Sequence, residues 1–242
     1  MVTKIKYTEE ELSLFEGIHS AILEKTENKI AAKIKTGHHK IDEAGIEKQC
    51  TTEFFSEFEG QVSQSCKYTD DFLALLKHDD AKLYEQLSHK IEHYSADFEK
   101  VKNFHDLVKF GKHLKFSEPM LEKIFQIGTH HYKTGHYQNA FLYFNWLCSV
   151  EGDNPQMWFL KGVVEQNLER YNDALISYYG VIALHQDFIP VYTQLMNCLL
   201  LMGNKKAAKE VYDIFTKNVD PSAYKHDKTF VENLHCLKDV LF

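Results

Sequence analysis

The chain has 242 residues, of which 44% are hydrophobic and 26% are charged, with 11 glycines and 4 prolines. This is the composition of a folded globular protein, and it excludes the disordered, collagen-like and fibrous classes. The formal net charge of -7 argues against a nucleic-acid partner, because such binding depends on lysine and arginine side chains that neutralise phosphates.

The five cysteines are scattered, and no two of them form a CxxC pair. This pattern argues against a disulfide framework or a zinc site, and it fits a reducing cytoplasm. No apolar core follows the basic residues at the start, so no secretory signal is expected. The longest apolar stretch is far shorter than the ~18 residues of a membrane span, so no integral membrane segment is expected either.

The chain begins with a region that is predicted to be helical. Thr8 and Glu11 form a capping box ahead of an apolar stripe, which predicts a helix over about residues 8–34. Residues 36–68 are polar and contain three glycines, so we expect a linker-like segment. The phenylalanines between positions 54 and 58 suggest one short helix inside it.

Two shorter helices are predicted next. Thr69 is placed to cap a helix that runs through Leu76, and Asp79 or Asp80 is placed to cap the following one. The following helix carries a heptad-like apolar seam, which either packs on its own domain or forms a homodimer interface. Its length of under three heptads favours packing on its own domain. The seam consists of Tyr84, Leu87, Ile91, Tyr94, Phe98 and Val101.

From residue 118 onward, each proline opens a new apolar-periodic segment, as prolines in the first turn of a helix do. A 34-residue period relates these segments, and it is the signature of the tetratricopeptide repeat (TPR), a pair of antiparallel helices. The sequence therefore predicts an all-α protein with a helical region over 1–117, three repeats over 118–220 and a capping helix over 221–242. The period links Ala140, Ala174 and Ala208, Gly128 and Gly162, and Phe144, Tyr178 and Tyr212.

Small residues mark the places where the two helices of a repeat should approach each other, as at Gly128 and Ala140. The third repeat departs from the pattern, because Met196 stands in place of the glycine and Lys205 in place of a tyrosine. Such departures are typical of an end repeat, which a further helix must cover. That helix is predicted after Pro221, with apolar positions at Phe230, Leu234, Leu237 and Leu241.

No catalytic constellation stands out, since GxGxxG, P-loop and GxSxG motifs are all missing. We therefore expect no enzyme and no cofactor. His89 and His93 have the i, i+4 spacing of two metal ligands, but no third ligand is evident and a solvated helix face is favoured over a metal site. The adjacent His130 and His131 are interpreted as surface and groove residues, and helix capping accounts for the Asp79–Asp80 pair.

A short repeat solenoid offers a concave surface lined by the first helix of each repeat, here called the predicted groove. Its mixed apolar and amide lining would suit an extended peptide. The alternative is that Phe125 and Phe159 are simply core residues. The 34-residue alignment assigns to the predicted groove Phe125, Thr129 and Tyr132 of the first repeat, Phe159, Val163 and Gln166 of the second, and Thr193, Asn197 and Leu200 of the third.

Three stretches of the repeats resemble the class II chaperones of bacterial type III secretion, the SycD/LcrH group. They are YKTGHYQNAFLYFNWLC at 132–148, WFLKGVVEQNLERYNDALISY at 158–178 and NCLLLMGNKKAAKEVY at 197–212. The resemblance implies a cytoplasmic bacterial protein whose groove holds an extended segment of a hydrophobic translocator protein before export. It also implies that Phe125 and Tyr132 are groove aromatics, with Thr129 at a third place that is aromatic in the family.

The first 100 residues are much longer than the family's usual N-terminal segment, which often mediates dimerisation. We expect them to add a dimer interface, a second client surface or a separate role. Two other functions therefore stay open beside the chaperone. One is a general TPR scaffold or regulatory adaptor whose N-terminal half carries a separate activity. The other is an enzyme with a catalytic N-terminal domain, suggested by the histidines and carboxylates there.

Overall fold

The computed structural model describes residues 68–91, 114–185 and 187–242. Within these ranges the chain forms α-helices and one short 3-10 helix, with no strand, which confirms the predicted all-α class. The predictions for residues 8–34 and 36–68 and for the seam beyond Ile91 lie outside the described residues. The chain divides into two compact units with a boundary after Ser177, and each unit is described here by itself.

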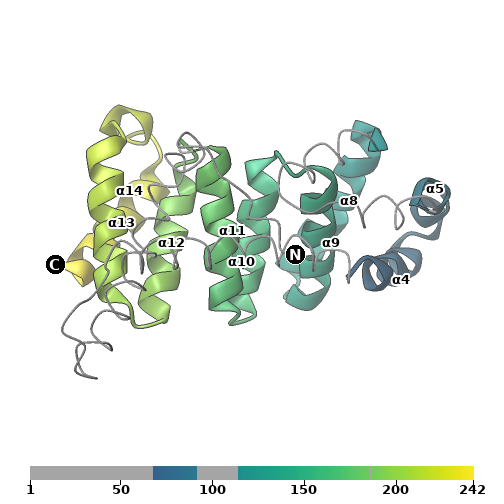
Figure 1. Cartoon of the computed structure of the whole chain (residues 1–242), viewed down its shortest axis with the longest axis horizontal. Helices are drawn as coiled ribbons and strands as arrows, with labels where there is room; N and C mark the ends of the chain where they lie inside the picture. The colour runs from purple at the N-terminus through teal and green to yellow at the C-terminus, as the bar shows by residue number, and fades with distance from the viewer. Residues whose placement is uncertain (1–67, 92–113, 186) are drawn as a thin grey trace, which may run out of the picture. The chain divides into compact units, whose positions relative to one another are not determined.

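The first unit holds two helix pairs and the helices that follow them (Figure 1). Helix α9 packs against α8, which precedes it in the sequence, and against α10, which follows it. Helix α4 packs against both α5 and α9. The helices are α4 (Thr69–Asp79), α5 (Ala81–Ile91), α8 (Glu118–Lys133), α9 (Tyr137–Val150), α10 (Pro155–Asn167) and the first half of α11 (Tyr171–Leu184).

The second unit contains the last predicted repeat, formed by α12 (Pro190–Leu201) and α13 (Lys205–Asn218). The terminal helix α14 (Lys228–Leu241) packs against both of them, as the predicted capping helix should. It begins later than predicted, because Pro221 opens only a 3-10 turn, η2 (Pro221–Ala223). The side chain of Asp227 then caps α14 by accepting the backbone N–H of Phe230 at 3.0 Å.

The 34-residue period also appears in the backbone of the turns between paired helices. Residues 135, 169 and 203 occupy the same place in the three repeats, and all three have the left-handed conformation, with φ of 78° at Gly135, 60° at Glu169 and 77° at Gly203. Glycine adopts this conformation freely, whereas other residues pay about 1 kcal/mol or more for it. The second repeat therefore keeps the turn geometry even without the favoured residue.

The close approach of the paired helices is confirmed in the first repeat. Ala140 is fully buried, and a Cβ atom added to Gly128 would lie 2.8 Å from the Cβ atom of Tyr143 on the neighbouring helix α9. A Cβ–Cβ separation that short does not occur in relaxed proteins, and neither atom belongs to the flexible end of a side chain. Only glycine therefore fits at this position without moving the helices apart.

The Gly128→Ala variant should therefore be less stable than the wild type, by about 1 to 3 kcal/mol, because overpacking outweighs the better helix propensity of alanine. Urea unfolding followed by circular dichroism measures the difference. Gln126→Ala is the matched control, since Gln126 is an exposed residue of the same helix, and it should stay within about 0.5 kcal/mol of the wild type. A Gly128→Ala variant as stable as this control would contradict the close approach of α8 and α9.

Two details of the predicted helix ends were wrong. Thr69 is the first residue of α4 rather than its cap, and no side-chain capping bond forms there. The helix also continues beyond Leu76 to Asp79, because the backbone N–H of Asp80 still reaches the Leu76 carbonyl at 2.7 Å. The cap of the next helix is confirmed at Asp80, whose carboxylate accepts the backbone N–H of Leu83 at 2.9 Å.

Candidate functional site

The predicted groove residues of the first unit lie on α8 and α10. All six are half-buried, whereas the residues next to two of them, Ile124 and Trp158, are completely buried. Phe125 and Phe159 are therefore less covered than these core neighbours. The six residues are Phe125, Thr129, Tyr132, Phe159, Val163 and Gln166.

The aromatic members of this set rest against aromatic residues of the following helix. The Phe125 ring lies 6.1 Å from the Phe144 ring, and the Tyr132 ring lies 5.7 Å from the Tyr137 ring. Both residues are half-buried, so each ring packs on its neighbour and keeps part of its surface exposed. Thr129 lies between them along α8, and its hydroxyl oxygen is buried without a hydrogen-bond partner among the described residues.

The third set of predicted groove residues belongs to the second unit. Asn197 and Leu200 are half-buried, but Thr193 is buried and its hydroxyl donates to the Pro190 carbonyl of the same helix at 3.1 Å. Thr193 is therefore the least accessible of the predicted residues. At the end of this helix Leu201 and Met202 are exposed large apolar side chains.

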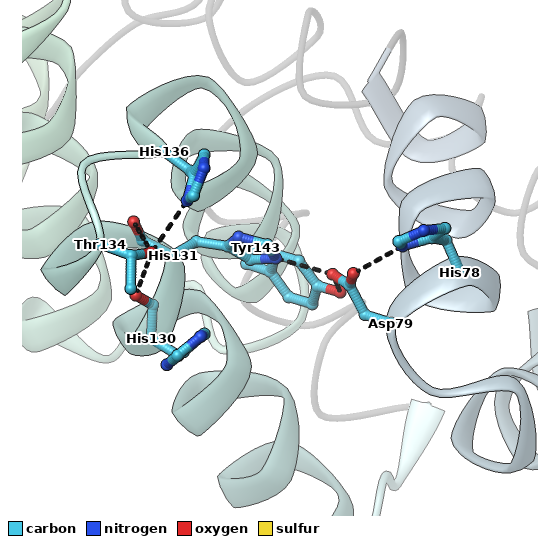
Figure 2. A network of polar contacts seen from close by, with 7 residues as sticks. All are labelled: His78, Asp79, His130, His131, Thr134, His136 and Tyr143. Carbon is cyan, nitrogen blue, oxygen red and sulfur yellow. Dashed lines mark hydrogen bonds and ion pairs between the residues drawn. The ribbon is translucent and has the colours of Figure 1, made fainter.

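A polar network joins α4 to the first repeat, and sequence reasoning missed it (Figure 2). One carboxylate oxygen of Asp79, Oδ2, accepts hydrogen bonds from His131 Nε2 and from the Tyr143 hydroxyl, both at 2.7 Å. The other oxygen accepts a bond from His78 Nδ1 at 3.0 Å. The side chains of His131 and Asp79 are 13% and 15% exposed. His131 is therefore a half-buried partner of Asp79, a contact that its interpretation as a surface or groove residue did not include.

The surroundings of Asp79 favour its ionised form. Burial alone would raise the pKa of the carboxyl, but the hydrogen bonds from His131, His78 and Tyr143 outweigh it, and the pKa lies below its ordinary value. Burial and then the neighbouring Asp79 carboxylate raise the pKa of Tyr143, which stays a neutral donor. Asp79 accordingly does not act as the expected helix cap, because its carboxylate binds side chains of α8 and α9.

The lowered pKa of Asp79 gives a pH dependence with a definite sign. Its stabilising effect should be fully present above the pKa of the unfolded chain, about 4, and should disappear as the pH falls through the lower folded value. At pH 7 we expect Asp79→Asn to cost about 1 to 3 kcal/mol. Denaturant unfolding at several pH values should show this difference shrinking below about pH 4, and a difference that grows on acidification would contradict the network.

A second polar network is buried inside the second repeat. Lys161 Nζ lies 2.8 Å from Glu165 Oε1, and both residues are 2% exposed. The Ser177 hydroxyl donates to Glu165 Oε2 at 2.6 Å and accepts from Lys161 Nζ at 3.1 Å. Burial raises the pKa of Glu165, and the lysine and the serine counteract it. The charges of this buried pair are thus compensated by each other and by one hydroxyl.

The two networks occupy the same places of the 34-residue register. His131 aligns with Glu165 and Leu199, and Tyr143 aligns with Ser177 and Val211. In the first repeat the two positions bind an aspartate from α4, in the second a lysine from the same repeat, and in the third they are both apolar and buried. Aligning the three repeats by the 34-residue period therefore shows from the sequence alone that these two positions are polar in the first two repeats and apolar in the third.

The proposed dimer seam is described only at its start. Leu87 is 0% exposed, Ile91 is buried and Tyr84 is half-buried, all within the single chain. Tyr94 and Phe98 lie outside the described residues. At Leu87 the side chain is thus already covered by its own chain, as the alternative of packing on its own domain requires.

The described ranges contain no group of three or more histidine, cysteine, aspartate or glutamate residues that could hold a metal ion. His89 is exposed, and His93 lies outside the description. Among the helices of those same ranges, none has the length and apolar character required to cross a membrane. The candidate binding surface of these ranges is the half-buried face of α8 and α10.

Structures of a type III secretion translocator chaperone are among the solved structures that this chain is similar to. SycD of Yersinia enterocolitica is 19% identical over 52% of this chain and 84% of SycD, with a TM-score of 0.46. SycD in complex with a peptide of the translocator YopD aligns at 19% identity over 52% and 98%, with a TM-score of 0.44. PcrH, a protein of Pseudomonas aeruginosa, in complex with the chaperone binding region of PopD aligns at 19% over 52% and 92%, with a TM-score of 0.46.

Models of protein families and the curated proteins contain no match to this chain. The assignment of helices and repeats to this chain rests on its own residues and contacts.

Proposed function

We propose that this chain is a type III secretion chaperone that binds extended segments of a hydrophobic translocator protein on the predicted groove. The observation that carries the proposal is the half-buried face of α8 and α10. Phe125, Tyr132, Phe159 and Val163 stand on it at repeat-related positions, neither covered by the core nor fully exposed.

The chemistry of this face suits an extended apolar segment. Half-buried rings provide flat apolar contacts for the side chains of a client, and truncating such an anchor costs roughly 2 kcal/mol or more of binding free energy. The client supplies apolar side chains at intervals and leaves the backbone between them for polar contacts. Gln166 adds an amide group to the same face.

We infer the class of the client, a hydrophobic translocator protein, from the sequence resemblance to class II chaperones. SycD has been solved with a peptide of the translocator YopD and PcrH with the chaperone binding region of PopD. For this chain the proposal is the same kind of client, held in the bacterial cytoplasm without catalysis. The chaperone would cover the apolar segment and prevent premature assembly before export.

Co-expression with a candidate translocator tests the proposal. The candidates are large proteins with long apolar segments encoded beside this chain. The translocator should be recovered in the soluble fraction as a complex when the chain is present, and as aggregate when it is absent. A translocator that aggregates equally in both cases would contradict the proposal, and a folded partner that binds residues 1–117 instead would support the scaffold alternative.

A further inference from the structure

The last turn of α8 is held from two sides. His131 donates to Asp79 of α4 at 2.7 Å, and Thr134 donates to the backbone carbonyls of His130 and His131 at 2.9 and 3.1 Å. Tyr132, a predicted groove residue, lies between these positions in the sequence. Figure 2 shows the Asp79 side chain reaching from α4 toward His131 and Tyr143. The backbone that carries Tyr132 is therefore fixed by a contact from outside the repeat.

The position of Asp79 is unusual for an acidic residue. It is the last residue of α4, where the negative end of the helix dipole disfavours a carboxylate. Its stable ionised state therefore depends on the donors that surround it, which are His78 of its own helix and His131 and Tyr143 of the first repeat. Two of the three donors are supplied by the repeat, so the carboxylate binds α4 to α8 and α9 at one point.

Apolar contacts attach α4 to α9 independently of this carboxylate. The Phe72 ring stacks on the Trp146 ring with centroids 4.7 Å apart, and Phe72 is fully buried. Phe72 also meets the Tyr143 ring edge-on at 5.4 Å, so α4 and α9 are packed by ring contacts that do not use the carboxylate. Loss of the Asp79 carboxylate should therefore leave the helices packed and change only how that turn is held.

We propose that Asp79 is a positioning residue of the predicted groove, which holds Tyr132 in place through His131 at the end of α8. The inference rests on the proposed function where it concerns the client. The helix pair α4–α5 then does more than cover the end of the repeats, because it fixes the position of Tyr132, which contacts the client segment. The second repeat has no need of such an outside contact, since Lys161 pairs with Glu165 within the same helix.

A client-free measurement tests the positioning step in the full chain. Amide hydrogen exchange is followed in the wild type, in Asp79→Asn and in Tyr143→Phe, which removes one donor to the carboxylate and keeps the ring. Both variants should accelerate exchange at residues 130–136 more than in α10, which shares only the general loss of stability. Asp80→Asn is the matched control, because asparagine still caps α5 and only the ion pair with Lys123 is lost. Unchanged exchange at 130–136 in both variants would overturn the inference.

A binding measurement tests the consequence for the groove. The probe is a fluorescent peptide of the translocator recovered by co-expression. Asp79→Asn should weaken its binding about 2- to 30-fold, and Asp79→Glu, which keeps a carboxylate, should restore most of the affinity. The Asp80→Asn control should bind like the wild type.

A double-mutant cycle separates positioning from a general loss of stability. In a Tyr132→Ala background Asp79→Asn should have no further effect on affinity, whereas in a Phe159→Ala background it should keep its full effect. Equal effects in both backgrounds would overturn the inference. Failure of the peptide to bind the wild type at all would instead count against the proposed function, and the exchange measurement would still decide the role of Asp79.

Discussion

Replacing Lys161 with methionine should destabilise the first unit by about 3 to 5 kcal/mol, because it leaves the Glu165 carboxylate buried without its cation. The two charged atoms are 2.8 Å apart, and both side chains are almost completely removed from water. Methionine keeps most of the lysine's length and apolar stem, so lost packing is a small part of the effect. Urea unfolding monitored by circular dichroism measures the cost.

The third repeat supplies the control for this prediction. It carries Leu195, Leu199 and Val211 at the positions of Lys161, Glu165 and Ser177, and these three residues are buried at 0%, 3% and 2% exposure. The triple variant Lys161→Leu, Glu165→Leu, Ser177→Val should therefore be about as stable as the wild type, or up to about 4 kcal/mol more stable. If the triple variant were as unstable as Lys161→Met, the comparison between the repeats would be wrong.

Leu87→Asp with Ile91→Asp should abolish the packing of α4 and α5. Leu87 is completely covered by its own chain, and an aspartate in its place loses the buried apolar contacts and adds an unpaired charge. The loss of contacts alone is worth about 2 to 5 kcal/mol, which exceeds what a two-helix pair can be expected to tolerate. Circular dichroism should show a loss of helix, and limited proteolysis should cut between residues 69 and 91.

Gln86→Asp is the matched control for this pair, because Gln86 is exposed on the same helix. It should keep the helical signal and the proteolytic pattern of the wild type. The opposite result for the double variant, a folded monomer derived from a wild-type dimer, would show that the seam is a subunit interface. Size-exclusion chromatography with light scattering distinguishes the two outcomes.

The repeats could be predicted from the sequence because their signals are local and periodic. Pro155 and Pro190 start helices, Gly135 and Gly203 take the left-handed turn, and Gly128 fits a contact that excludes a Cβ atom. Each of these residues has one physical reason for its place, and the 34-residue spacing repeats that reason. The capping helix was predicted from four apolar positions in the sequence and from the need of the end repeat for a cover.

The polar networks could not be predicted from local signals. Asp79 is separated by 52 residues from His131 and by 64 from Tyr143, and no pattern within α4 indicates that its last residue faces another helix. Aspartate commonly caps helix starts, so Asp79 and Asp80 were both candidates for the cap of α5. Only Asp80 caps that helix. Lys161 and Glu165 resemble a solvated i, i+4 pair when α10 is considered alone, and only the apolar Leu195 and Leu199 at the same positions of the third repeat indicate their burial.

The most direct test of the proposed groove is the affinity of the chain for an extended translocator segment. Isothermal titration calorimetry should show that Phe125→Ala and Tyr132→Ala each weaken binding by roughly 2 kcal/mol, about 30-fold. Gln126→Ala, an exposed residue of the same helix, should bind like the wild type. If both groove variants bind as tightly as the wild type, or if the control weakens equally, the client does not bind on this face of α8.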